Sequence, residues 1–306
     1  MLNQSIFVFK KILAFFPPSA PVKIYRIISS LSPFKKIVNI LIRAMIPRTL
    51  KIEEGELELD QDDVAVSGML ALGTFEKTET ALFKKRLKES MTVIDIGASI
   101  GYYTIIAGKY VGKNGKVFAF EPEDRNFSLL SRNIVSNNLY NVIALKVALA
   151  GQSGDGLLYL DKDNKGHHSL SPPKNPAAKE AVSVEMDTLD NILEKYGSPQ
   201  IDLIKIDIEG AETLALEGMK KTIIKNPELV LFTEFYPAAI KRLGHSPFKF
   251  LADLQGAGFS LFEIDEDRKS LKKVEDPEGF ILNFPKGESF TNLYATRVAD
   301  LNGEMM

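Results

Sequence analysis

The stretch from residue 92 to residue 103 constrains the fold more than any other part of the chain. It reads TVIDIGASIGYY, in which an apolar run ends in a turn containing Gly97 and Gly101 and continues into a helix-like pattern. Glycines at these points permit a tight turn and let a ligand approach the backbone, and free amides at a helix start can donate hydrogen bonds to it. The pattern predicts a buried strand, a ligand-binding loop and a helix.

A second strand is predicted over residues 116–120, and it ends directly before Glu121. An acidic residue at that point of a nucleotide-binding fold hydrogen-bonds the ribose hydroxyls of a bound nucleoside. Dinucleotide enzymes use G-x-G-x-x-G in the preceding loop, but here Ser99 stands at the second glycine and Asp95 ends the strand. A carboxylate there suits a cationic cofactor better than a pyrophosphate, which favours S-adenosylmethionine. The alternative is an NAD-dependent Rossmann oxidoreductase.

Three blocks of the sequence together resemble the signature of FkbM-type S-adenosylmethionine-dependent methyltransferases. They are DIGASIGYYT at 95–104, FEP at 120–122 and KIDIEGAE at 205–212. The third block is the most specific, because most class I methyltransferases share the glycine loop. Ser99 stands where the family more often has Asn. The resemblance implies an α/β fold with a class I (Rossmann-like), mostly parallel seven-stranded sheet.

The pattern along the chain supports that fold independently. Strands alternate with helices, which predicts a mostly parallel sheet with helices on both faces. Beyond the first two strands, further ones are expected near 142–147, 201–206, 228–232, 259–264 and 292–297, the last of them antiparallel. Helices are expected near 76–90, 124–137 and 247–256, and an inserted strand pair near 157–160 and 181–186.

Residues at the carboxyl ends of these strands are the predicted cofactor-binding residues, because ligands of such sheets bind there. The glycine loop would hold the methionine part and Glu121 the ribose, while the resemblance places Ala148 near adenine. Asp207, after the fourth predicted strand, would face the methyl donor and the acceptor. The full predicted set is Asp95, Gly97, Ala98, Ser99, Gly101, Glu121, Ala148 and Asp207.

Methyl transfer to a hydroxyl also needs a group that takes its proton. Asp207, Glu209 and Glu234 are the candidate catalytic carboxylates, because they follow or end strands that should open into the cleft. His168, next to His167 in the insertion, is the fourth candidate, since a histidine can accept a proton near neutral pH. Alternatives are a helix-capping role for the first two carboxylates and a solvated loop for the histidine pair. The three carboxylates could gather oxygen ligands for magnesium, but no His-rich spacing supports a metal, and no metal ligand is assigned.

Lys205 lies within the fourth predicted strand. A lysine in a buried strand needs an opposite charge. We therefore expect Lys205 to anchor a carboxylate rather than to perform chemistry.

The first 52 residues form a basic arm on an acidic body. They carry nine Lys and Arg and no Asp or Glu, whereas the remaining residues hold 29 basic and 40 acidic side chains. Helical spacing of apolar residues predicts an amphipathic helix over 32–45, and lysines and prolines interrupt the arm too often for a membrane span. The arm can lie on an anionic membrane surface, or pack on the body or on a second copy of the chain.

Two parts are therefore expected, the helical arm at 1–52 and the methyltransferase domain at 53–306. The alternation of acidic residues with Leu57, Leu59, Val64 and Val66 predicts two short strands at the start of the domain, joined by an acidic turn.

Together these features predict an S-adenosylmethionine-dependent O-methyltransferase. The resemblance implies a hydroxyl of a saccharide, glycolipid or similar polyol-derived acceptor. The chain has no cysteine, which excludes disulfide frameworks and thiol chemistry and makes the cytoplasm the default location, with peripheral membrane contact as a variant. The acidic body disfavours a nucleic-acid substrate. A catalytically inactive methyltransferase-like membrane or assembly protein is the further alternative.

Overall fold

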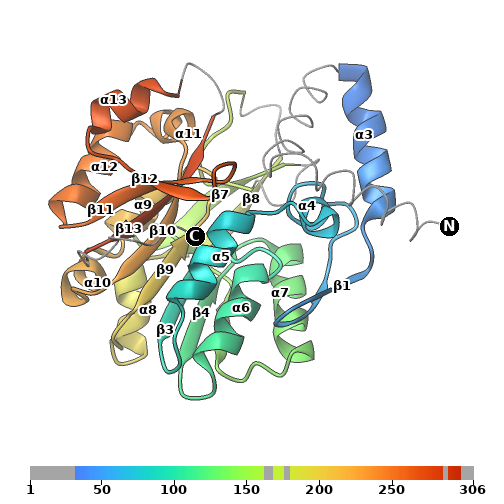
Figure 1. The fold of residues 1–306 in the computed structure, drawn as a ribbon, viewed down its shortest axis with the longest axis horizontal. Helices are drawn as coiled ribbons and strands as arrows, with labels where there is room; N and C mark the ends of the chain where they lie inside the picture. Colours follow the sequence, from blue (N-terminus) through green and yellow to red (C-terminus); the bar gives the residue numbers. More distant parts are fainter. Residues whose placement is uncertain (1–31, 162–167, 176–179, 285–288, 298–306) are drawn as a thin grey trace.

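The structure is a computed structural model that describes residues 32–161, 168–175, 180–284 and 289–297 (Figure 1). Its helices are α3 (Ser32–Met45), α4 (Val66–Leu72), α5 (Lys77–Arg86), α6 (Tyr102–Val111), α7 (Asp124–Ser136), α8 (Leu189–Lys195), α9 (Glu212–Glu217), α10 (Lys220–Lys225), α11 (Pro237–Arg242), α12 (Pro247–Gly256) and α13 (Pro277–Leu282). Its strands are β1 (Thr49–Ile52), β2 (Gly55–Glu58), β3 (Thr92–Ile96), β4 (Lys116–Phe120), β5 (Val142–Leu145), β6 (Ala148–Leu149), β7 (Gly154–Leu160), β8 (Glu180–Asp187), β9 (Leu203–Ile206), β10 (Val230–Phe235), β11 (Ser260–Asp265), β12 (Ser270–Lys273) and β13 (Thr291–Thr296).

An eight-stranded sheet lies at the centre, in the order β12-β11-β13-β10-β9-β3-β4-β5. β10, β9, β3, β4 and β5 run parallel, and β13 runs antiparallel between β10 and β11. Seven of these strands are the predicted ones, and β12 adds an eighth by folding back on β11. The predicted class I, Rossmann-like fold is confirmed. Strand order reverses between β3 and β9, which is where such sheets bind ligands.

Alternate residues of each central strand pack into two apolar layers. Ile94 and Ile96 of β3 join the layer that contains α8, α10 and α12, whereas Val93 joins the layer that contains α5 and α6. Helices therefore cover both faces of the sheet, as predicted (Figure 1). Strands that are covered on both faces are nearly continuously apolar. Four of the five β3 residues are buried, and the only polar residue among these four is Asp95.

The predicted inserted strand pair is β7 and β8, which pair antiparallel over the whole length of β7. β6 pairs parallel with β8 and completes a separate three-stranded sheet, in the order β6-β8-β7. Ser169, in the connection between β7 and β8, forms an isolated antiparallel bridge with Tyr159. The insertion is thus a small sheet of its own.

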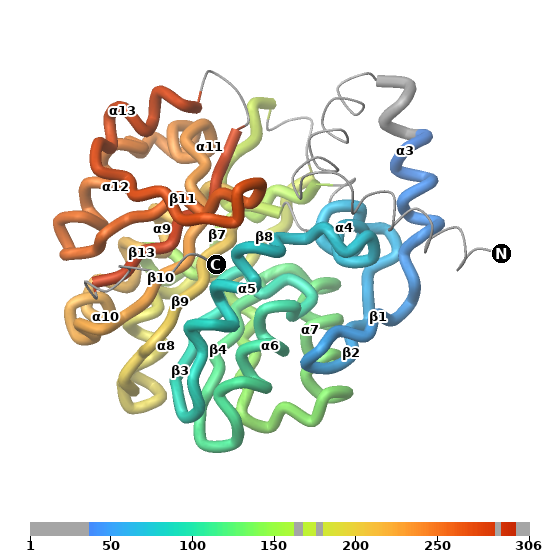
Figure 2. Tube along the Cα trace, in the orientation of Figure 1, coloured from blue at the N-terminus to red at the C-terminus, as the bar shows by residue number. Residues whose placement is uncertain are grey.

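The predicted strand pair at the start of the domain is wrong in position. The hairpin is β1–β2, with its turn at residues 53–54, and Val66 begins α4 instead of a strand. Contacts with α7 select this register, because the backbone N–H groups of Glu56 and Glu58 donate to the side-chain amides of Asn137 and Asn133. Figure 2 shows the hairpin running beside α7.

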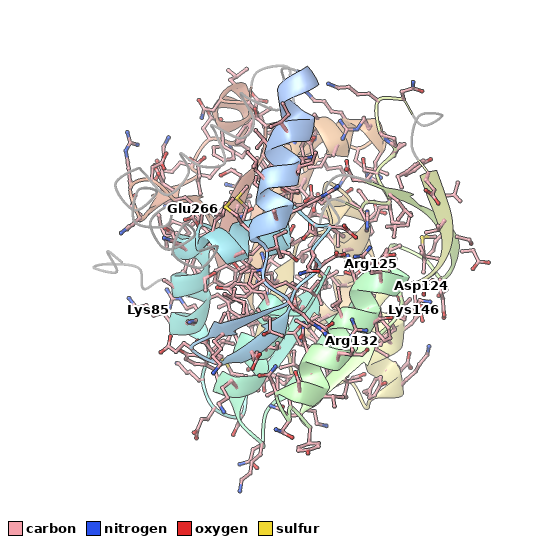
Figure 3. All side chains as sticks on the ribbon, turned by 90° about the vertical axis from the view of Figure 1, so that its right-hand side faces the viewer. Lys85, Asp124, Arg125, Arg132, Lys146 and Glu266 are labelled. Carbon is pink, nitrogen blue, oxygen red and sulfur yellow. The ribbon has the colours of Figure 1, made fainter. Side chains whose placement is uncertain are left out.

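Two arginines of α7, which Figure 3 labels, pair with acidic residues at the end of β2 and directly after it. Arg132 pairs with Glu58 at 2.8 Å, and Arg125 contacts Asp60 at 2.5 Å and Asp62 at 2.9 Å. These three acidic residues are therefore paired with arginines of the domain.

The predicted helix over 32–45 is α3, which lies at the edge of the molecule (Figure 1). Its predicted apolar face is divided: Ile42 is buried, whereas Ile37 and Leu41 are exposed. No helix in the described part of the chain is long and apolar enough to span a bilayer. The division at residues 52 and 53 stays a prediction, and the β1–β2 hairpin crosses it.

Candidate functional site

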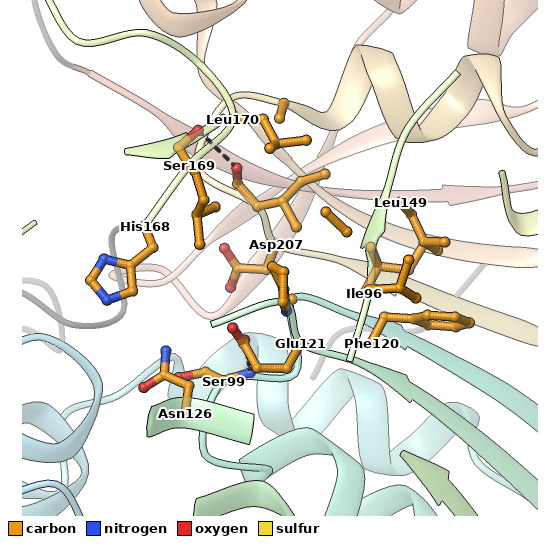
Figure 4. Close-up of a pocket in the computed structure, with 17 residues that line it drawn as sticks. Ile96, Ser99, Phe120, Glu121, Asn126, Leu149, His168, Ser169, Leu170 and Asp207 are labelled. Atoms are coloured by element: carbon orange, nitrogen blue, oxygen red, sulfur yellow. Dashed lines mark hydrogen bonds between the residues drawn. The ribbon is translucent and has the colours of Figure 1, made fainter. Parts of the chain in front are cut away.

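A pocket opens at the carboxyl ends of β3, β4 and β9, beside the inserted sheet (Figure 4). Its empty volume is about 530 Å³, including the space open to solvent. Five of the predicted cofactor-binding residues line it: Gly97, Ser99, Glu121, Ala148 and Asp207. The strand ends thus bring together residues that lie far apart in the sequence.

The glycine loop, which runs from Gly97 to Gly101, contributes Gly97 and Ser99 to the lining of the pocket. Gly97 has a φ of +82°, and a Cβ at this position would overlap the main-chain oxygen of Asp207. The N–H groups of Gly97 and Ala98 both donate to the carbonyl of Phe120, each at 2.9 Å. This close approach joins the ends of β3, β4 and β9, and only glycine permits it.

Asp95, Ala98 and Gly101 do not line the pocket. The buried carboxylate of Asp95 accepts a 2.5 Å hydrogen bond from the Thr104 hydroxyl of α6, and burial raises its pKa to about 6. Gly101 starts α6 with a φ of +96°. These three residues belong to the loop or support it but do not line the pocket. A direct role for them in cofactor binding therefore stays a prediction.

Glu121 links the end of β4 to the glycine loop. Its two carboxylate oxygens accept hydrogen bonds from the backbone N–H groups of Ser99, at 2.8 Å, and Glu123, at 2.9 Å. The side chain is buried, and burial raises its pKa to about 7. Glu121 is therefore a positioned hydrogen-bond acceptor that lines the pocket.

The residues of the pocket fit S-adenosylmethionine. Apolar side chains on one wall, such as Val147, Leu149 and Leu158, suit an adenine ring, and the carboxylates of Glu121 and Asp207 suit a cationic ligand with hydroxyl groups. When bound, this cofactor supplies a methyl group activated by its sulfonium. Binding of the ribose by Glu121 and of adenine near Ala148 stay predictions.

Three of the predicted catalytic residues gather at the edge of the pocket. Carboxylate oxygens of Asp207, Glu209 and Glu234 all lie within 4.8 Å of one another. Neighbouring parallel strands bring them together, because Asp207 follows β9 and Glu234 lies in β10. Glu234 is 4% exposed, and burial together with the nearby charge of Glu209 raises its pKa well above the usual value.

Lys205 anchors carboxylates, as predicted. Its buried Nζ lies 2.8 Å from Glu79, 3.4 Å from Asp207 and 3.7 Å from Glu76, and 4.3 Å from the centre of the Tyr103 ring. Two of these partners, Glu76 and Glu79, precede the first signature block and were not predicted from the sequence. A buried lysine requires such partners, but the sequence does not show which carboxylates approach it.

His168 lines the pocket, while His167 lies outside the described residues. The Nδ1 atom of His168 accepts a hydrogen bond from the backbone N–H of Asp161 at 3.0 Å. A neutral imidazole that accepts through Nδ1 carries its proton on Nε2, so it can donate to a substrate hydroxyl but not take a proton there. The carboxylates are the better candidates for the base.

A side chain of the insertion, Ser169, forms hydrogen bonds to the third signature block, and the sequence did not predict this contact. The Ser169 hydroxyl contacts the carbonyl oxygens of Ile208, at 3.2 Å, and Glu209, at 2.8 Å (Figure 4). Ser169 and Asn126 also line the pocket. Serine and asparagine carry no pattern that would have singled them out.

A mostly parallel sheet in which β13 runs antiparallel between β10 and β11, with this glycine loop and an acidic residue after β4, has the architecture of a class I methyltransferase. The family model described as "Methyltransferase FkbM domain" matches residues 95–261. The chain belongs to this family, and it is an S-adenosylmethionine-dependent methyltransferase. The NAD-dependent oxidoreductase alternative is set aside.

Individual relatives are distant. The chain is similar to Methyltransferase sdnD of Sordaria araneosa, at 29% identity over 178 residues, which is 49% of this chain and 68% of that protein. It is also similar to Hexuronic acid methyltransferase AglP of Haloferax volcanii, at 25% identity over 151 residues, 48% of this chain and 58% of that protein. A solved structure, methyltransferase FkbM from Methylobacillus flagellatus KT, has 14% identity and a TM-score of 0.40, covering 85% of this chain and 59% of that one.

Proposed function

We propose that the chain is an O-methyltransferase whose acceptor is a hydroxyl of a saccharide, glycolipid or similar polyol-derived molecule. The observation that carries the proposal is the position of Asp207, which lines the pocket and lies within 4.8 Å of two further carboxylates. Carboxylates accept hydrogen bonds from hydroxyl groups, and a carboxylate at the reacting oxygen can take its proton.

Methyl transfer requires the chain to align the acceptor hydroxyl with the cofactor and to supply a proton acceptor. The acceptor oxygen forms a bond to the methyl carbon as the sulfur–carbon bond breaks, and the hydroxyl proton passes to a carboxylate. Asp207 is the proposed base, because its side chain is 27% exposed and reaches the pocket. His168 also lines the pocket, and its direct part in the reaction stays a prediction.

The similarity to Hexuronic acid methyltransferase AglP supports a sugar acceptor. That protein and this chain share only 25% identity, so the sugar and the methylated position do not follow from the similarity. Enzymes that share one fold can act on many different acceptors, because the residues of the local site determine which acceptor binds.

The test is transfer of labelled methyl from S-adenosylmethionine to a panel of uronic acids, hexose glycosides and glycolipids. We expect an alkali-stable methyl ether as the product, and a loss of kcat of about 10²- to 10⁴-fold for Asp207→Asn. The matched control is Glu185→Gln, an exposed carboxylate of β8 outside the pocket, which should leave kcat unchanged. Alkali-labile methyl esters would show that carboxyl groups are the acceptors. Cofactor binding without transfer to any hydroxyl would support the inactive alternative.

We further propose that α3 contacts an anionic membrane surface. Ile37, Ile40 and Leu41 are 56%, 64% and 58% exposed, and their spacing places them on one face of the helix. The first 52 residues, which include α3, carry nine basic and no acidic side chains. Exposed apolar residues on a basic segment suit an anionic lipid surface, where each basic residue contributes about 1 kcal/mol.

Sedimentation with vesicles of phosphatidylserine and phosphatidylcholine tests this contact. We expect the full chain to sediment with anionic vesicles but not with pure phosphatidylcholine, and Ile37→Ser/Ile40→Ser/Leu41→Ser to stay in solution. Ile224→Ser is the control, because Ile224 is 80% exposed in α10. Unchanged sedimentation of the triple variant would refute the proposal. A lower molecular mass of that variant in solution would instead show that α3 joins two copies of the chain.

A further inference from the structure

We infer that Asp207, Glu209 and Glu234 form a binding site for a divalent cation of the magnesium type at the edge of the cofactor pocket. Their carboxylate oxygens all lie within 4.8 Å of one another. Oxygen ligands lie about 2.1 Å from Mg²⁺ and about 2.4 Å from Ca²⁺, so oxygens on opposite sides of one ion are about 4 to 5 Å apart. One ion can therefore reach all three carboxylates.

The state of Glu234 points to a missing ligand. Its side chain is buried, at 4% exposure, and its Oε2 atom has no hydrogen-bond partner among the described residues. Buried carboxylates in proteins are normally paired, hydrogen-bonded or bound to a metal, since an isolated one is costly. An oxygen of this side chain is aimed into the cluster, because it lies within 4.8 Å of Asp207 and Glu209. The inference therefore does not rest on acidic residues being close together alone.

The charges around Glu234 are unfavourable without a cation. Glu209, Glu212, Asp207 and Glu76 all place negative charge near it. Glu212 is fully buried, and its own Oε2 also has no hydrogen-bond partner among the described residues. A divalent cation would offset this accumulated charge in a way that a water molecule does not.

Among the ion pairs of the described residues, the positive charge nearest to this cluster is that of Lys205. This lysine also pairs with carboxylates outside the cluster. Its Nζ atom lies closest to Glu79, at 2.8 Å, and reaches Asp207 at 3.4 Å and Glu76 at 3.7 Å. Lys205 is therefore positioned on the α5 side of Asp207. The cation would bind Asp207 from the side of Glu234.

The backbone holds the third ligand in an uncommon conformation. Glu209 has a φ of +56° and is followed by Gly210 at +95°, and a non-glycine residue in this region costs about 1 to 2 kcal/mol. Side-chain contacts hold the loop: the Ser169 hydroxyl donates to the Glu209 carbonyl, and the Glu212 side chain accepts from the Gly210 N–H. The loop is thus built to keep Glu209 near Asp207 and Glu234.

The role of the cation toward an acceptor rests on the proposed function. A hydroxyl bound to a divalent cation loses its proton more easily, because the cation stabilises the alkoxide that forms. The hydroxyl proton would pass to the carboxylate oxygen of Asp207 that does not bind the cation. The cation would then orient the acceptor beside Asp207, at the edge of the pocket.

Binding of Mn²⁺ and Mg²⁺ to the full chain tests the site without any acceptor. Protein treated with a chelator and dialysed is titrated with Mn²⁺, followed by the loss of the free-ion electron paramagnetic resonance signal, and with Mg²⁺ by calorimetry. We expect one saturable site in the wild type and at least a tenfold loss of affinity in Glu234→Gln. Glu185→Gln, outside the cluster, should bind as the wild type does.

Thermal unfolding shows whether the variant is folded. Glu234→Gln keeps the shape of the buried side chain and cannot become charged, so it should melt at or above the temperature of the metal-free wild type. Added Mg²⁺ should raise the melting temperature of the wild type only. Absence of a saturable site in the wild type, or equal affinity in a folded Glu234→Gln, would overturn the inference. Metal binding without methylation of a hydroxyl would instead overturn the proposed acceptor and leave the cation site standing.

Discussion

Gly97→Ala is expected to lower the free energy of unfolding by about 2 to 4 kcal/mol and to abolish cofactor binding. A Cβ at this position would overlap the main-chain oxygen of Asp207. The overlap cannot be relieved by a side-chain rotation, so the ends of β3 and β9 must separate, at a cost of about 1 to 3 kcal/mol. The φ of +82° adds about 1 kcal/mol for a residue with a Cβ. Urea unfolding and calorimetric titration with S-adenosylmethionine measure the two effects.

Gly244→Ala is the matched control for this substitution. Gly244 has a φ of +81°, almost that of Gly97, but a Cβ there would meet nothing within 4 Å. Its cost should therefore be only the backbone term, about 1 kcal/mol, with cofactor affinity unchanged. Equal losses of stability in the two variants would show that the contact between Gly97 and Asp207 does not constrain the site.

Local sequence patterns were sufficient to predict seven of the eight strands of the central sheet and the position of the glycine loop. The run at 92–103 contains a strand, a turn that needs glycine and a helix start, and each of these is determined by neighbouring residues. The residue that follows β4 could be named for the same reason. Strand-end residues then meet at one edge of the sheet because the strands are parallel.

Features that depend on contacts between distant segments could not be predicted. The acidic segment after residue 53 alternates as a strand does, but Asn133 and Asn137 of α7 fix the hairpin several residues earlier. Likewise, Lys205 pairs with Glu79, which lies 126 positions away. Single residues with common side chains, such as Ser169, carry no periodic signal at all.

The burial of the apolar stripe of α3 likewise depends on contacts with another segment and could not be predicted. The sequence correctly predicts the helix, since its spacing is local. Which residues of the apolar stripe are buried depends on the position of α4, whose Gly68 lies close to Ile42. Ile37 and Leu41 of the same stripe are exposed, and the sequence could not show which residues of the stripe are buried.

Affinity for S-adenosylmethionine is expected to rise up to about tenfold between about pH 6 and about pH 8, because the ionised carboxylate of Glu121 is the stronger acceptor for ribose hydroxyls. Burial raises the pKa of Glu121 to about 7 from a usual value of 4.5. With the pKa raised in the folded chain, the contribution of Glu121 to stability is present below about pH 4.5 and is lost as the pH rises through about 7. Cofactor binding should oppose this loss, since it favours the ionised form. Calorimetric titration across this pH range measures the effect.

Two variants separate Glu121 from the other acid near the loop. Glu121→Gln should bind the cofactor at least about tenfold more weakly at pH 8, since a charge-assisted hydrogen bond contributes about 1.5 to 3 kcal/mol, and its affinity should no longer rise with pH. Asp95→Asn is the comparison, because burial raises the pKa of Asp95 to about 6 and its carboxylate faces Thr104 of α6. If the pH dependence persists in Glu121→Gln and disappears in Asp95→Asn, the loop rather than the ribose contact controls binding. If both variants keep it, neither carboxylate holds the cofactor in the proposed way.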